Sequence, residues 1–300
     1  MEPLKSPVFL TPHWDDYELI DCGGFEKLER FGQWITIRPE PQALWNKSLP
    51  EQQWQRLASA LFRRESGNLD RGQWILSDRM PQQWYIAYKY KDISFSMRLG
   101  LTSFKHVGVF PEQADNWNFI CDSVRSLAPV LQRKPNVLNL FAYTGGASLA
   151  AAAAGAEVTH VDAVKQVVSW ARDNADRSRL EGIRWIVDDA MKFVNRELRR
   201  GKLYDGIVLD PPAYGRGPGG EKWLLEQQLN EMLTACSKLL NPAGGFLVLN
   251  LYSMGLSALL AKSLVDGIFP TCKKEEFGEL FFRDRGQHML PLGVFYRSQY

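Results

Sequence analysis

The residues best suited to chemistry form a short run, Asp210-Pro-Pro-Ala-Tyr214, directly after a predicted strand. Pro211 and Pro212 fix the backbone and remove two N–H donors, so the turn offers one carboxylate and several carbonyl oxygens. Such a set of acceptors suits a planar group that carries donors, such as a nucleobase edge, with an aromatic ring nearby for stacking. The alternative is a rigid structural turn in which Tyr214 only packs.

A second candidate is the glycine turn in Asn139-Leu-Phe-Ala-Tyr-Thr-Gly-Gly-Ala-Ser148, which also follows a predicted strand. Glycines at this place let the backbone turn tightly and approach a ligand. The next helix would point its N-terminal N–H groups at the same spot. The spacing is not G-x-G-x-x-G, because Gly145 and Gly146 are adjacent, so an ordinary turn between strand and helix is the alternative.

Acidic residues end two further predicted strands. Asp162 lies 162 − 145 = 17 residues after Gly145, where a carboxylate can accept hydrogen bonds from both ribose hydroxyls of a nucleoside. Asp189 could accept from the exocyclic amine of an adenine. Both could instead be helix N-caps. The glycine turn and Asp162 suit NAD and S-adenosylmethionine equally, but an NAD-dependent oxidoreductase would not explain the acceptor turn at Asp210.

The elements that must position these residues alternate between strand and helix from Asn136 onwards. The predicted strands are 137–141, 157–161, 183–187, 206–209 and 246–251, and the predicted helices are 147–154, 163–178, 190–200, 226–240 and 257–268. Such alternation predicts an α/β fold with a mostly parallel sheet covered by helices on both faces. Residues 278–282 and 292–296 predict a terminal hairpin, hence at least one antiparallel strand.

The first hundred residues have a different texture, with short aromatic and β-branched runs separated by glycines. They predict strands over 17–20, 25–30, 33–38, 74–76, 84–88 and 93–98. The spacing of Trp54, Leu57, Leu61 and Phe62 predicts a helix over 52–64. We therefore expect a β-rich N-terminal module over residues 1–98 and a second domain over 99–300, with a helix over about 114–127.

The amino-acid composition limits the classes of protein to which the chain can belong. Hydrophobic residues make up 45% of the 300 and charged residues 23%, which excludes a disordered chain. Neither a glycine triplet period nor a sustained heptad is visible, which excludes a collagen-like or coiled-coil chain. The net charge of +2 neither requires nor excludes a nucleic-acid partner. The four cysteines are scattered, so no disulfide scaffold and no metal site is expected. No signal peptide or membrane span is expected either, and the default location is the cytoplasm.

With these residues in place, the chain resembles the class I S-adenosylmethionine-dependent methyltransferases. The similarity rests on NLFAYTGG, the HVD strand end, VDDA and LDPPAY, and covers roughly residues 100–300. FAYTGG with DPPAYGRG is similar to bacterial large-subunit ribosomal RNA methyltransferases that make 5-methylcytosine or 7-methylguanine. The resemblance implies a Rossmann-like, seven-stranded, mostly parallel sheet, S-adenosyl-L-methionine as cofactor, RNA as partner, and a β-rich RNA-binding module before it.

The resemblance also implies roles for individual residues. The cofactor-binding set would be Phe110, Gln113, Phe141, Ala142, Tyr143, Thr144, Gly145, Gly146, Asp162, Asp189, Ala190 and Asp210. The set that faces the target base would be Asp210, Pro211, Pro212 and Tyr214.

One departure from the family pattern concerns the nucleophile. The 5-methylcytosine enzymes need a cysteine at the end of the fifth strand, where this chain has Asn250-Leu-Tyr-Ser253. The spacing of Cys236 within its predicted helix is better explained by core packing. We therefore expect methyl transfer to a nitrogen of a nucleobase in ribosomal RNA. The alternatives are a methyltransferase acting on protein or a small molecule, and a noncatalytic RNA-binding relative.

Overall fold

The computed structural model describes residues 6–65, 71–252 and 255–300. The chain forms two compact units. The large unit comprises Met1–Leu10, Asp115–Leu280 and Leu292–Tyr300, and the small unit comprises Thr11–Ala114 and Phe281–Pro291.

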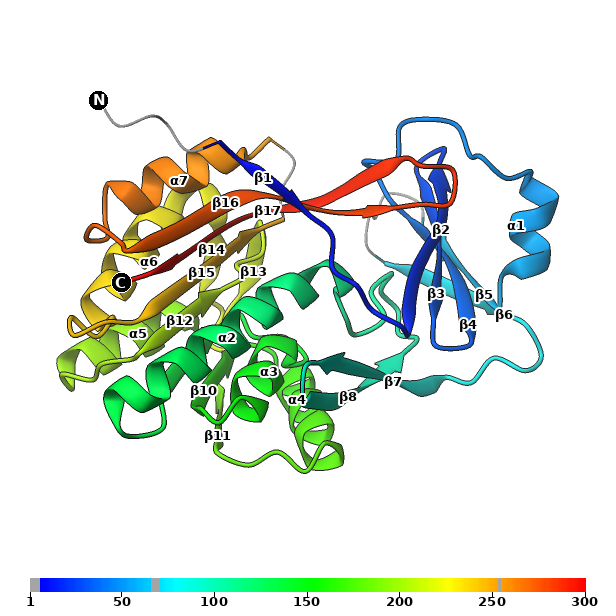
Figure 1. The fold of residues 1–300 in the computed structure, drawn as a ribbon. Coiled ribbons are helices and arrows are strands. Elements are labelled where there is room, and N and C mark those ends of the chain that lie inside the picture. The colour runs from blue at the N-terminus through cyan, green and yellow to red at the C-terminus, as the bar shows by residue number, and fades with distance from the viewer. Residues whose placement is uncertain (1–5, 66–70, 253–254) are drawn as a thin grey trace. The chain divides into compact units, whose positions relative to one another are not determined.

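The large unit contains the mostly parallel sheet that the sequence predicted (Figure 1). Its strand order is β1-β16-β17-β15-β12-β9-β10-β11. Strands β15, β12, β9, β10 and β11 run parallel to one another, and β17 runs antiparallel to β15. The bounds are β1 (Val8–Leu10), β9 (Asn136–Leu140), β10 (Glu157–Asp162), β11 (Ile183–Val187), β12 (Gly206–Leu209), β15 (Phe246–Leu251), β16 (Lys274–Arg283) and β17 (Met289–Gln299).

Helices cover both faces of this sheet. Leu138 and Leu140 on β9 pack with α5, α6 and α7, whereas Val137 packs with α2 and α3. Alternate residues of a strand point to opposite faces, so one strand contributes to both cores. The helices are α2 (Ala114–Leu131), α3 (Gly146–Ala153), α4 (Lys165–Arg177), α5 (Ala190–Arg199), α6 (Leu225–Leu239) and α7 (Ala258–Asp266). Among the described helices, none is both long and apolar enough to cross a membrane.

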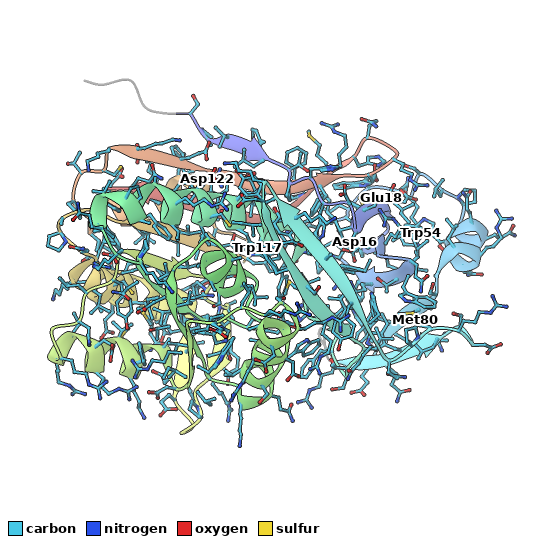
Figure 2. All side chains as sticks on the ribbon, turned by 60° about the horizontal axis from the view of Figure 1, so that its bottom comes forward. Asp16, Glu18, Trp54, Met80, Trp117 and Asp122 are labelled. Carbon is cyan, nitrogen blue, oxygen red and sulfur yellow. The ribbon has the colours of Figure 1, made fainter. Side chains whose placement is uncertain are left out.

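The small unit is β-rich. It contains a five-stranded sheet in the order β2-β3-β4-β5-β6 and a two-stranded sheet of β7 and β8. Its apolar core includes Leu28, Ile37 and the fully buried Trp54 (Figure 2). The bounds are β2 (Tyr17–Gly23), β3 (Glu26–Phe31), β4 (Trp34–Pro39), α1 (Glu51–Leu57), β5 (Ala60–Arg64), β6 (Gly72–Leu76), β7 (Gln83–Tyr90), β8 (Ile93–Gly100) and the 3₁₀ helix η1 (Pro111–Gln113).

One predicted element is wrong: the helix over 52–64. Helix α1 ends at Leu57, Ala58 is extended, and β5 begins at Ala60. Strand β5 pairs parallel with β4 and antiparallel with β6, so Leu61 and Phe62 belong to a sheet. Strand pairing across distant segments outweighs a local helical pattern of apolar residues.

One strand and a two-stranded ribbon lie beyond the prediction. Strand β1 pairs with β16 and makes the large sheet eight-stranded rather than seven-stranded. A short antiparallel ribbon of β13 (Tyr214–Arg216) and β14 (Lys222–Leu224) follows the Asp210 turn. Strands of three residues carry too few side chains to show an alternating pattern in the sequence.

Candidate active site

The predicted chemical residues lie at one edge of the large sheet because their strands are paired in register. Leu140 on β9 pairs with Leu209 on β12 and with Val161 on β10, and Leu209 pairs with Leu249 on β15. The residues that follow these pairs therefore leave the sheet side by side. Open α/β sheets bind their ligands at this edge, beyond the carboxyl ends of the strands.

The turn after β9 has a strained backbone. Phe141 and Tyr143 have φ of 56° and 48°, in the left-handed region that side chains other than glycine seldom adopt. Each such residue costs about 1–2 kcal/mol. Hydrogen bonds from Ala142 N to Val161 O (3.1 Å) and from Gly145 N to Ala142 O (3.0 Å) hold the turn. Strain of this kind persists only where the surroundings over-determine the backbone, and it is concentrated at ligand sites.

Contacts from two neighbouring elements, β10 and α4, hold the turn in this conformation. The amide N–H of Tyr143 donates to Asp162 Oδ2 at 2.9 Å. The side chain of Asn174, buried on α4, donates from Nδ2 to the Thr144 carbonyl at 3.0 Å. Asn174 could not be predicted from the sequence, because one asparagine in a polar helix carries no motif.

The two glycines of the turn are needed for different reasons. Gly145 has φ of 91° and precedes the first turn of α3. Gly146 lacks an unusual φ, but a Cβ placed there would lie 2.3 Å from Trp117 Cζ2. Trp117 projects from α2 (Figure 2) and is buried. Gly146 is therefore fixed by the space that the indole occupies.

Beneath the turn lies a buried chain of polar side chains. Asn139 Nδ2 donates to Ser148 Oγ at 2.9 Å, and Ser148 Oγ lies 3.0 Å from His160 Nδ1. Burial lowers the pKa of His160 to about 3, against a smaller opposing contribution from a hydrogen bond with the Tyr143 backbone. A neutral imidazole ties β10 to α3 without adding a charge.

Asp162 combines two backbone contacts with partial burial. Besides Tyr143, the N–H of Val164 donates to its Oδ1 at 2.9 Å. Burial raises the pKa of Asp162, and these backbone donors act in the opposite direction. Each carboxylate oxygen has a second lone pair, so the contacts leave capacity for donors from a ligand.

At the end of β11 the capping alternative holds for Asp189. Its side chain accepts from Lys192 N at 2.9 Å and caps α5, which begins at the buried Ala190. Its neighbour Asp188 pairs with Arg196 at 2.8 Å. A cap uses one carboxylate oxygen, so the predicted contact with adenine remains compatible with the structure and stays a prediction.

The Asp210 carboxylate is partly buried and has few partners. Asn250 Nδ2 donates to its Oδ1 at 2.7 Å. Burial raises the pKa of Asp210 to about 6, and the hydrogen bond from Asn250 lowers it in part. Among the described residues no donor reaches the carbonyl of Pro211. The turn therefore presents acceptors, as the sequence predicted.

An indole joins this turn to the strained turn after β9. Trp223 Nε1 on β14 donates to the Pro212 carbonyl at 2.7 Å. Its ring centroid lies 4.8 Å from that of Phe141. No sequence motif marks Trp223, since it lies 223 − 210 = 13 residues after Asp210 on a strand too short to predict. Its contacts keep the two turns together.

Tyr214 stands on the surface at the start of β13. Its side chain is 52% exposed, and its hydroxyl lies 2.8 Å from Arg216 Nε, which donates to it. An exposed phenol ring beside the acceptor turn is free to stack on a flat ligand. The alternative of Tyr214 as a buried packing residue does not fit this exposure.

Phe110 and Gln113 belong to the small unit. The Phe110 ring lies 5.2 Å from that of His106, and Gln113 is buried in η1. Their predicted contact with a cofactor stays a prediction.

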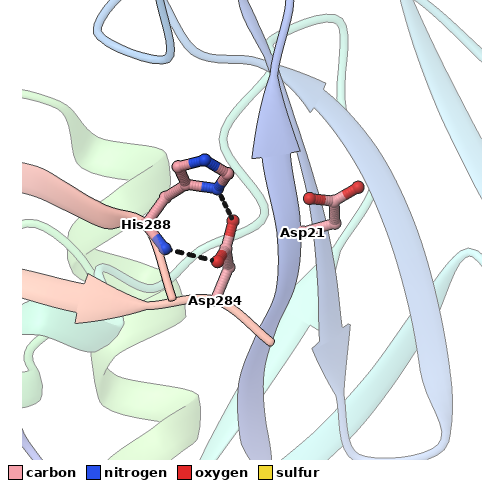
Figure 3. Close-up of side chains that lie close together, drawn as sticks. All are labelled: Asp21, Asp284 and His288. Carbon is pink, nitrogen blue, oxygen red and sulfur yellow. Dashed lines mark hydrogen bonds and ion pairs between the residues drawn. The ribbon is translucent and has the colours of Figure 1, made fainter. Parts of the chain in front are cut away.

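Side chains with metal-ligand chemistry gather in the small unit at Asp21, Asp284 and His288, within 4.8 Å of one another. His288 bonds to Asp284 through its backbone N–H and its ring (Figure 3). The Asp21 carboxylate accepts from Cys22 N, Ser48 N, Leu49 N and Trp54 Nε1. Donors already occupy these oxygens, so the cluster is explained by hydrogen bonding within the unit.

The family follows from comparison with known proteins. Residues 97–266, more than half of the chain, match the model of a family described as S-adenosylmethionine-dependent methyltransferase. The chain belongs to this family, and its cofactor is S-adenosylmethionine. A crystal structure of a SAM-dependent methyltransferase from Agrobacterium tumefaciens is 39% identical, with a TM-score of 0.88 over 98% of this chain and 94% of that one.

Other relatives match a smaller share of this chain at lower sequence identity. A ribosomal RNA large subunit methyltransferase K/L from Shewanella frigidimarina is 31% identical over 51% of this chain and 21% of its own length. That from Shewanella loihica is 35% identical over 42% and 18%. The chain thus spans about a fifth of these relatives. The crystal structure of SMU.776 complexed with SAH, at 19% identity and TM-score 0.68 over 92% of this chain and 72% of that one, shares the fold.

Gly146→Ala tests the close approach of Trp117. The added methyl would collide with the indole, so we expect a loss of about 1–3 kcal/mol in the free energy of unfolding, as for other overpacked cores, with weaker binding of S-adenosylmethionine. Urea unfolding and calorimetry measure the two effects. The double variant Gly146→Ala/Trp117→Leu should regain part of the cofactor affinity, and equal affinity in wild type and Gly146→Ala would contradict the packing argument.

Asp210→Asn tests the cost of the carboxylate. The folded-state pKa of about 6 lies above the usual 3.8, so folding favours the protonated form and ionised Asp210 destabilises the fold above pH 6. We expect the variant to gain up to about 3 kcal/mol at pH 8 and to lose that gain as the pH falls towards 4. Thermal unfolding at both pH values measures it. A variant less stable than wild type at pH 8 would be inconsistent with this account.

Proposed function

We propose that this methyltransferase transfers its methyl group to a nitrogen of a nucleobase in RNA, with ribosomal RNA as the favoured substrate. The observation that carries the proposal is the turn at Asp210, where a carboxylate and the Pro211 carbonyl offer acceptors beside the exposed ring of Tyr214. Donor-bearing, flat groups are what such a turn recognises. The names of the ribosomal RNA relatives support the substrate class, which would place the enzyme in the cytoplasm.

The cofactor would lie across the ends of β9, β10 and β11. The turn from Phe141 to Gly146 would surround its methionine end, where α3 has no side-chain cap and its first N–H groups are available to a carboxylate. Asp162 would hold the ribose, and Asp189 with Ala190 the adenine. Bound there, S-adenosylmethionine supplies an electrophilic methyl carbon.

The chain's own residues would supply alignment. Asp210 and the Pro211 carbonyl would accept hydrogen bonds from an amino group and keep its lone pair directed at the methyl carbon. For a ring nitrogen the same atoms, with Pro212 and Tyr214, would position the base. Most of the acceleration then comes from proximity and orientation. The base must leave its stack, which favours an unpaired or splayed nucleotide.

The cysteine distribution supports nitrogen over carbon. Addition to a pyrimidine ring needs a thiolate at the site. At the end of β15 the described residues are Asn250, Leu251 and Tyr252, and the predicted tip residue Ser253 lies outside the described residues. Cys236 is fully buried within α6, and burial raises the pKa of its thiol, so it belongs to the core as predicted.

We also propose that residues 1–98 form an RNA-binding module and residues 99–300 the methyltransferase domain. Arg63 and Arg64 stand exposed on β5, and the ring of Tyr85 is 47% exposed on β7. Exposed arginines and aromatic rings are the usual contacts for unpaired RNA. Arg63→Ala/Arg64→Ala should weaken RNA binding and flatten its salt dependence; unchanged binding in filter assays would contradict the assignment.

A labelled-methyl assay tests the substrate. Purified protein and labelled S-adenosylmethionine are incubated with ribosomal RNA from a strain that lacks the enzyme, and separately with its protein and small-molecule fractions. We expect label in RNA, on a nitrogen identified by nucleoside mass spectrometry. Asp210→Asn should lose about 100-fold or more in transfer, in the range for removing one group that acts in the transition state.

Asp176→Asn provides a matched control. Asp176 is exposed near the end of α4, about three turns from the strand ends, so the same substitution there should leave transfer unchanged. Label on carbon 5 of cytosine would refute nitrogen transfer alone. Label confined to the protein or small-molecule fraction would favour the alternative substrates, and no label in any fraction would favour a noncatalytic relative.

A further inference from the structure

Asn250 is a buried polar residue in an otherwise apolar strand, β15. All six residues of β15 are buried, and Asn250 is 2% exposed between Leu249 and Leu251. A buried amide in an apolar strand is destabilising unless each polar atom finds a partner. Its presence therefore calls for a reason beyond packing.

Its amide nitrogen has a partner. Nδ2 donates to Asp210 Oδ1 at 2.7 Å, a length typical of a hydrogen bond to a charged acceptor. An ionised carboxylate can only accept, so the amide must turn its NH₂ towards Asp210. The orientation of Asn250 is thereby fixed by Asp210.

The amide oxygen of Asn250, by contrast, has no hydrogen-bond partner among the described residues. This atom, Oδ1, is buried. A Cβ on Gly293 of β17 would lie 3.5 Å from this oxygen, so the strand beside it presents no side chain there. Half of the amide is thus left unsatisfied by the fold, so the burial of Asn250 costs stability.

We infer that Asn250 is a positioning residue for methyl transfer, whose side-chain NH₂ holds the Asp210 carboxylate in the rotamer and the ionised form that accept a hydrogen bond from the substrate. The inference rests on the proposed role of Asp210 at the target base. Asn250 itself touches neither substrate nor cofactor in this account, and acts through Asp210.

Asn250 is the group that lowers the pKa of Asp210. Burial raises that pKa and the Asn250 hydrogen bond lowers it. No charged group among the described residues contributes to that pKa, including Asp162 on β10, Lys192 on α5 and Glu221 before β14. Lys192 and Glu221 form an ion pair with each other.

The test combines Asn250→Leu, Asp210→Asn and the double variant. In wild type and Asn250→Leu, the Asp210 carboxyl is titrated by carbon-13 NMR, with its signal assigned by its loss in Asp210→Asn. We expect the pKa of Asp210 to rise by roughly one unit in Asn250→Leu, the size expected for losing one charge-assisted hydrogen bond. Asn250→Ala serves as a second variant should leucine not fit, and Leu247→Met on the same strand controls for repacking.

The kinetic readout is the pH profile of kcat/KM for methyl transfer. The acidic limb of Asn250→Leu should move upward with the pKa, reducing kcat/KM by up to about tenfold below pH 6. Above pH 8, where Asp210 is ionised in both proteins, the loss should be smaller. The affinity for S-adenosylmethionine should stay within about twofold of wild type. In the Asp210→Asn background, Asn250→Leu should cause no further change in the pH profile, because the carboxyl whose titration it shifts is absent.

The outcomes separate the two proposals. An Asp210 titration that is unchanged in Asn250→Leu overturns the positioning role, whatever the substrate. Independent losses that multiply in the double variant overturn it as well. A shifted titration in an enzyme that methylates no RNA refutes the proposed substrate, while the control of Asp210 by Asn250 stands.

Discussion

The site depends on the parallel, in-register pairing of β10, β9, β12 and β15. That pairing aligns Val161, Leu140, Leu209 and Leu249 across the sheet. The next residues along each strand then leave the sheet at the same height, and a shift of one residue would turn every core side chain to the opposite face. The apolar cores on both faces therefore fix the positions of polar residues that contribute little to those cores.

Pairing alone does not shape the turns, which are shaped by side chains that approach from other elements. Trp117 of α2 limits residue 146 to glycine, Asn174 of α4 holds the Thr144 carbonyl, and Trp223 of β14 joins Phe141 to Pro212. Each is buried. A backbone held in left-handed conformations by rigid, buried neighbours keeps one shape before a ligand arrives, which reduces the entropy lost on binding.

Features that depend on local periodicity could be predicted from the sequence. Features that depend on contacts between distant segments could not. The alternation from Asn136 onwards and the strand-end acids were readable because strand and helix periods differ and parallel strands share an edge. The helix over 52–64 was wrong because its second half, Leu61 and Phe62, is governed by pairing with β4 and β6. Trp223 and Asn174 carry no motif, and their roles follow from partners far away in the sequence.

A comparison of the two carboxylates that flank β12 shows why Asp210 points to function. Asp205, before the strand, is buried, but hydrogen bonds from Arg133, Asn241 and the Asn136 backbone outweigh that burial and keep its pKa below its usual value. Asp210, after the strand, has Asn250 as its one donor among the described residues, and its pKa lies above its usual value. The fold therefore stabilises the carboxylate at the amino end and not the one at the carboxyl end, where a substrate would supply the missing donors. A buried acid whose ionised form the fold disfavours is what the proposed role of Asp210 at the substrate requires, because perturbed carboxyl groups are concentrated at functional sites.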